Sequence, residues 1–86
     1  MPQQNPVSFD NCRVLGGGPT EDGTVNILLE LTDNNHTKDW YVANPNVRHE
    51  ILETALTALS ANLPVSVLLE STTRYSKLDR LYVMKQ

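Results

Sequence analysis

Residues 44–64, NPNVRHEILETALTALSANLP, decide the fold, because they read as one amphipathic helix with both ends marked. Asn44 before Pro45 predicts an N-cap followed by a proline in the first turn, with Asn46 as the competing cap. Asn62 in a left-handed conformation and Pro64 behind it predict the end of the helix. Apolar residues recur every three or four positions and should share the side that covers a sheet: Val47, Ile51, Leu52, Ala55, Leu56, Leu59 and Leu63.

The remaining side of this helix carries little charge repulsion, because several of its residues are small and uncharged. Such a surface can pack against a second copy of the chain, and a solvated surface is the alternative interpretation. We predict an oligomer interface at Thr54, Thr57, Ala58 and Ala61.

Segments typical of β-strands lie on both sides of the helix. Five strands are predicted, at residues 7–15, 24–32, 36–43, 65–69 and 77–85. The second and fourth alternate most clearly, with these residues facing inward: Val25, Ile27, Leu29, Leu31, Val65, Val67 and Leu69. The second and third are joined by a short turn and predict a hairpin.

Two strands change phase, and one connection is rich in glycine. The apolar pattern shifts near Asn11–Cys12 and again near Asp79–Arg80, which indicates a bulge or a bend in each outer strand. Residues 16–23 contain three consecutive glycines and read as a long flexible connection. A phosphate-binding loop is the alternative, but the lysine and hydroxyl residue of that motif do not follow.

Length and composition set limits on the class of protein. The chain has 86 residues, enough for one domain, which we place at residues 7–86 after a polar tail at residues 1–6. Cys12 is the only cysteine, so neither an intrachain disulfide nor a multi-cysteine zinc site is expected. The formal net charge of −3 argues against a general nucleic-acid binder, whose affinity depends on neutralising phosphates.

The sequence shows no membrane-spanning or secretory pattern. No apolar run has the length of a membrane span, and residues 1–20 lack the basic start and apolar segment of a signal peptide. We therefore expect no membrane insertion, and a cytoplasmic location is favoured. A mature secreted domain with a replaced start is the alternative.

Catalytic chemistry finds little support in this chain. His36 and His49 lie in different predicted elements, and Glu50 and Glu53 are expected on the exposed side of the helix. No arrangement of a nucleophile with a histidine follows from the pattern, and neither histidine has partners for a metal. We expect no enzymatic activity, no cofactor and no metal site.

Ligand binding by exposed aromatic residues is the better hypothesis. Trp40 and Tyr41 are adjacent in a strand, so they point to opposite faces and at most one lies in the core. The turn at residues 71–75 offers hydroxyls, a guanidinium and a ring that can contact a sugar or a nucleobase. An interface role for Trp40 and an ordinary turn role for Tyr75 are the alternatives. The candidate ligand-binding residues are Trp40, Tyr41, Thr72, Arg74 and Tyr75.

The order of the predicted elements favours one fold. Three strands, a helix and two strands is the order of the OB-fold, a partly open five-stranded Greek-key barrel. Bends in the first and last strands would help such a barrel to close. We predict a mainly β chain with one α-helix, folded as a five-stranded OB-type barrel. Other arrangements of one helix on an antiparallel sheet are the alternative.

Four segments resemble, in layout and spacing, the B subunits of AB5 bacterial toxins of the enterotoxin type. They are WYVA at 40–43, NVRHEILETALTALSANL at 46–63, VSVLLE at 65–70 and LDRLYVM at 78–84. The resemblance implies a ring of five subunits with edge strands paired between neighbours, helices lining the centre and one face that binds glycans. No sugar-binding motif of the family matches residue by residue, so no binding residue is carried over.

We therefore predict a non-catalytic, homo-oligomeric binding or assembly module, with a pentamer favoured and a glycan as the expected ligand. The alternative is an OB-fold that binds single-stranded nucleic acid or serves as a scaffold for a protein complex. Nucleic acid is disfavoured because the second and third strands with their turn bring Glu30, Asp33 and Asp39 beside Lys38.

Overall fold

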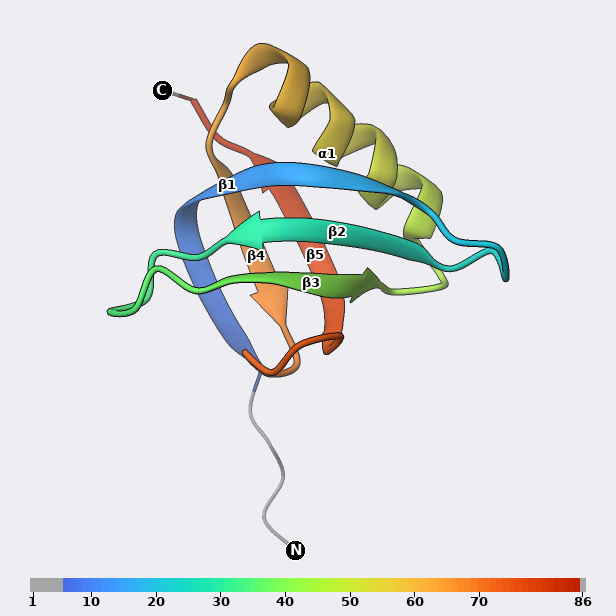
Figure 1. The fold of residues 1–86 in the computed structure, drawn as a ribbon. Helices are drawn as coiled ribbons and strands as arrows, with labels where there is room; N and C mark the ends of the chain where they lie inside the picture. Colours follow the sequence, from blue (N-terminus) through green and yellow to red (C-terminus); the bar gives the residue numbers. More distant parts are fainter. Residues whose placement is uncertain (1–5, 86) are drawn as a thin grey trace, which may run out of the picture.

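The computed structural model describes residues 6–85, and within them the chain is mainly β with one helix, as predicted (Figure 1). Three strands precede the helix and two follow it. The elements are β1 (Val7–Pro19), β2 (Val25–Glu30), β3 (Lys38–Ala43), α1 (Arg48–Ala61), β4 (Val65–Leu69) and β5 (Lys77–Val83). The predicted tail at residues 1–6 lies outside the described residues, apart from Pro6.

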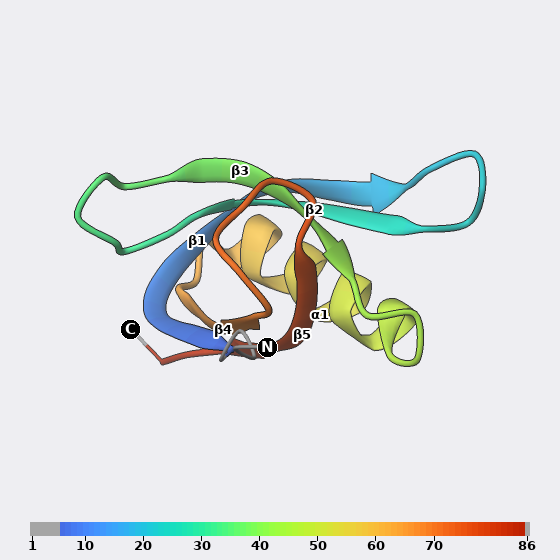
Figure 2. The same ribbon diagram turned by 90° about the horizontal axis from the view of Figure 1, so that it is seen from below.

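The strands form one closed sheet in the order β1-β2-β3-β5-β4, seen end-on in Figure 2. Neighbouring strands are antiparallel except β3 and β5, which are parallel and share only the pairs Val42–Lys77 and Ala43–Leu78. The remainder of β5, residues 79–83, pairs with β4 alone among the described strands. One edge of β5 is therefore open where the strand passes α1.

Bulges bend β1 and β5, the first and last strands of the chain, at the predicted places. In β1 the register shifts between Phe9 and Cys12, and Asn11 takes a left-handed conformation with φ 59°. The first half of β1 pairs with β4 and the second half with β2, so this bend carries one strand around the barrel. In β5, Arg80 pairs with Leu68 and Leu78 with Leu69, which leaves Asp79 as the extra residue.

The glycine segment is a correction to the sequence prediction. Residues 16–18 were expected in a flexible connection, but β1 continues through them to Pro19 and pairs with β2. A Cβ atom on Gly17 would lie 2.9 Å from Cδ1 of Ile27, closer than carbon atoms pack. Glycine at residue 17 therefore leaves room for the side chain of Ile27 on the paired strand.

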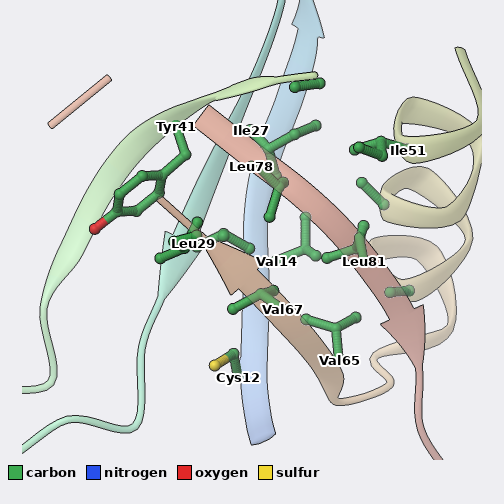
Figure 3. Packing of buried hydrophobic residues seen from close by; sticks show 14 of the residues in the cluster. Cys12, Val14, Ile27, Leu29, Tyr41, Ile51, Val65, Val67, Leu78 and Leu81 are labelled. Atoms are coloured by element: carbon green, nitrogen blue, oxygen red, sulfur yellow. The ribbon is translucent and has the colours of Figure 1, made fainter. Parts of the chain in front are cut away.

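Alternate strand residues fill the barrel (Figure 3). Every residue predicted to face inward in the second and fourth strands is buried: Val25, Ile27, Leu29, Leu31, Val65, Val67 and Leu69. Cys12 is also buried, and burial raises the pKa of its thiol. The alternation read from the sequence is confirmed.

The two ends of α1 differ in how well they were predicted. The helix begins at Arg48 rather than near Asn44, and Val47 precedes it without a side-chain cap. Asn44 instead closes a turn, because its Oδ1 accepts the Asn46 N–H at 3.0 Å and its carbonyl accepts the Val47 N–H at 3.0 Å. At the other end Asn62 adopts the predicted left-handed conformation, with φ 56°.

The helix is rotated relative to the prediction. Ile51, Ala55 and Ala58 face the barrel, whereas Leu56 and Leu59 are 45% and 41% exposed. The small side chains of the two alanines allow α1 to approach the barrel end closely, and the bulkier leucines then lie on its flank. Ala58 is therefore core and not part of an outer interface, which corrects the prediction at that position.

Candidate functional site

The loop between β4 and β5 closes the end of the barrel opposite α1 (Figures 1 and 2). The Tyr75 N–H donates to the Trp40 carbonyl at 2.7 Å, and the Val42 N–H donates to the Ser76 carbonyl at 3.1 Å. The loop therefore continues along the edge of β3 beyond the short β3–β5 pairing. We call Trp40, Thr72, Arg74 and Tyr75 the β3–loop patch; Trp40 is half-buried and the other three are exposed.

The loop has a defined internal geometry. Ser71 Oγ donates to Thr73 Oγ1 at 3.0 Å and accepts the Thr73 N–H at 3.1 Å. The Ser76 N–H donates to the Thr73 carbonyl at 3.1 Å, and Tyr75, between these two residues, has φ 64°. A tyrosine in this left-handed region is uncommon, and the bond to β3 holds it there. Its ring is 56% exposed.

An ion pair joins the loop to β3. Nε of Arg74 donates to Asp39 Oδ1 at 2.6 Å, and the Trp40 N–H donates to the same oxygen at 2.9 Å. The bond from Arg74 holds the pKa of the Asp39 carboxyl below its usual value, and it raises the pKa of Arg74. An arginine has five N–H donors, so one engaged Nε–H leaves most of the guanidinium for a ligand.

Tyr41 corrects the list of candidate ligand contacts. Its side chain is fully buried, and its hydroxyl donates to the Thr72 carbonyl at 2.9 Å (Figure 3). Burial raises the pKa of the phenol. Of the adjacent pair, Tyr41 is the core residue that fastens the loop from inside, and Trp40 lies on the outer face of the sheet.

The outer face of the sheet extends the β3–loop patch. Trp40 pairs with Leu28 on β2, and Leu28 pairs with Gly16 on β1, so the three form one row across the strands. Partners in an antiparallel pair share a face. The row combines an indole, an aliphatic side chain and a glycine without a side chain. The ion pair of Lys38 and Glu30 lies two pairs further along, on the same face. Sequence reasoning missed Gly16, Leu28 and Asp39.

The other chemically reactive residues are not brought together. His36 follows the β2–β3 turn, His49 is on α1, and Cys12 is inside the barrel. Within residues 6–85 no group of three or more metal-ligating side chains could hold an ion. In the same range no helix has the length and apolar character needed to cross a membrane.

Comparison with protein-family models and with curated proteins gives no match to this chain. The candidate site therefore rests on its own geometry, in which the loop brings a ring, a guanidinium and hydroxyls to the edge of β3. Such a set of groups stacks on an apolar ring face and donates hydrogen bonds around it.

The Asp39–Arg74 pair predicts a pH dependence of stability. Because the pKa of Asp39 is lowered in the folded chain, the pair stabilises above the unfolded pKa of about 3.9 and is lost as pH falls. Asp39→Asn should lower the melting temperature at pH 7, and the difference from wild type should narrow below about pH 4. Thermal unfolding from pH 3 to 7 measures this. Glu21→Gln, at an exposed acid that takes no part in the three ion pairs of residues 6–85, is the matched control. A difference in melting temperature that does not depend on pH would contradict the assignment.

Proposed function

We propose that this chain is an OB-type barrel that assembles into a homo-oligomeric ring, with five subunits favoured, and binds a glycan at the β3–loop patch. The strand order β1-β2-β3-β5-β4 and the helix between β3 and β4 support the fold assignment. The resemblance in layout to AB5 toxin B subunits supports the ring and the glycan.

The bond between the Tyr75 N–H and the Trp40 carbonyl carries the proposal for a ligand. It joins the backbones of two distant segments, one of which carries an exposed tyrosine ring and the other a half-buried indole. A sugar presents an apolar C–H face that stacks on an aromatic ring, and hydroxyls that accept hydrogen bonds. The hydroxyl of Thr72 and the guanidinium of Arg74 can supply polar contacts at the rim.

A glycan array tests the ligand directly. Wild type should retain a defined set of glycans, and Tyr75→Ala and Trp40→Ala should each weaken binding to them by about tenfold or more, which is about 1.4 kcal/mol. Asn34→Ala, at an exposed position in the β2–β3 turn, is the control and should bind as wild type does. Glycan binding that survives both aromatic substitutions would contradict the placement of the site. If wild type binds no glycan, the glycan part of the proposal is wrong and only the assembly role remains.

Single-stranded nucleic acid is the competing ligand for the same surface. It would stack bases on Trp40 and Tyr75, but the neighbouring cations Lys38 and Arg74 are already paired with Glu30 and Asp39 and leave little net positive charge for phosphates. Binding to an oligothymidine that falls steeply with added salt would favour this alternative over a glycan.

A further inference from the structure

Most of the exposed large apolar side chains lie on α1 or on β1 and β5, two strands that contact it. Within residues 6–85 they are Leu15, Leu56, Leu59, Tyr75, Tyr82 and Val83. Leu56 and Leu59 belong to α1, whereas Tyr82 and Val83 belong to β5. Tyr75 alone of the six lies in the β3–loop patch. Single exposed apolar residues are ordinary, but a group on neighbouring elements marks a contact surface.

One flank of α1 is lined by leucines. At 3.6 residues per turn Leu52, Leu56 and Leu59 share this flank, and Leu63 follows just beyond the end of α1. Leu52 and Leu63 are half-buried against the core. Leu15, which is 40% exposed, lies on β1. Two residues before it, Arg13 reaches the end of the helix and donates to Asn62 Oδ1 at 2.7 Å. We call Leu15, Leu56 and Leu59 the leucine flank.

The opposite flank of α1 borders a groove of about 310 Å³ beside the open edge of β5. The groove is lined by Val47, Glu50, Ile51, Thr54, Asp79, Arg80, Leu81 and Tyr82. The Arg80 guanidinium lies 5.0 Å from the centre of the Tyr82 ring, and its Nε is buried without an acceptor among the described residues. The groove thus combines apolar walls, an unpaired strand edge and an unsatisfied donor.

The two flanks differ in charge. Arg48 lies one turn before Leu52, so a cationic residue of the helix borders the leucines. The carboxylates of Glu50 and Asp79 line the groove together with the Arg80 guanidinium. One flank is therefore apolar with Arg48 at its border, and the other is a groove that presents two carboxylates and one guanidinium.

We propose that the leucine flank of one copy of this chain docks into the groove between α1 and β5 of a second copy, which rests on the homo-oligomer proposed above. This pairing brings apolar surface to apolar surface and Arg48 toward the carboxylates beside the partner's groove. A self-paired leucine flank would instead leave the groove of each copy uncovered. Because the two surfaces differ, the contact is heterologous, and it closes a ring when the rotation between copies permits.

Mixing two variants tests the docking. The double variant Leu56→Lys, Leu59→Lys removes the apolar surface of the leucine flank and leaves the groove intact. Thr54→Arg fills the groove with a bulky side chain and leaves the leucine flank intact. Native mass spectrometry should show each variant alone as a monomer and their equal mixture as a one-to-one dimer, because one intact contact remains in that pair. Ser60→Lys, at an exposed position outside both surfaces, is the control and should assemble as wild type does.

Circular dichroism establishes that each variant is folded. If a lysine variant is unfolded, Leu56→Ala with Leu59→Ala replaces it, and the dissociation constant should rise by about tenfold or more, about 1.4 kcal/mol. A wild-type oligomer that forms equally well from the leucine variants, or a mixture without the dimer, would overturn the docking and leave the proposed oligomer standing. A wild type that is monomeric at every concentration would overturn both.

Discussion

Tyr41→Ala should lower the free energy of unfolding by about 3–5 kcal/mol, the range for truncating a large buried aromatic side chain. The Tyr41 ring is fully buried in the barrel, and its hydroxyl holds the Thr72 carbonyl at 2.9 Å. Removal of the ring leaves a cavity and releases the loop. Since small domains have a total stability of about 5–15 kcal/mol, much of the chain should unfold at moderate denaturant concentration.

Tyr41→Phe separates the ring from the hydroxyl. It keeps the packing and removes one hydrogen bond, so it should cost about 1 kcal/mol. Urea unfolding followed by circular dichroism gives both values, with Tyr75→Ala as a control at an exposed tyrosine. Amide exchange should also show faster exchange of the Tyr75 N–H in Tyr41→Phe, because the loop has lost its inner attachment. A near-wild-type stability of Tyr41→Ala would contradict the buried position of the ring.

Local patterns predicted the elements whose structure is decided locally. Alternation in β2 and β4 identified the buried residues, because a strand with one face in the core must repeat every two residues. The apolar pattern changes phase in β1 and β5, and these changes predicted the bulges for the same reason. An extra residue moves every later side chain to the other face of the strand.

Properties that depend on close approach could not be read from such patterns. Glycines at 16–18 have turn-like composition, and only the position of the Ile27 side chain beside Gly17 shows why a strand has glycine at residue 17. The leucines of α1 outweigh its alanines in any hydrophobicity pattern, yet Ala55 and Ala58 are buried because they fit nearest to the barrel. Asn44 resembles an N-cap, but it closes a turn one step before the helix.

The candidate site was predicted in part because its residue types are informative by themselves. An aromatic pair and a turn rich in hydroxyls identified Trp40 and Tyr75, but their meeting depends on the topology that places the β4–β5 loop against β3. Asp39 has no distinguishing sequence signal, since its role comes from Arg74 35 positions away. Strand parity could have indicated Leu28, which shares a face with Asn26 and Glu30.

The close approach of α1 to the barrel leads to the second large effect, which is expected for Ala55→Leu. Ala55 has no exposed surface and belongs to the buried cluster that joins the helix to the strands. A leucine adds three carbon atoms where the packing leaves no room, so the helix must move away or neighbouring side chains must leave their rotamers. We expect a loss of about 1–3 kcal/mol in the free energy of unfolding.

Ala61→Leu makes the same chemical change at an exposed position in the last turn of α1. Alanine and leucine have similar helix propensities, so the control should change the free energy of unfolding by less than about 0.5 kcal/mol. Urea unfolding of both variants at one protein concentration gives the comparison. Equal losses of unfolding free energy in the two variants would show that helix propensity or assembly causes the effect. If the buried alanines set the distance between helix and barrel, only Ala55→Leu should lose stability.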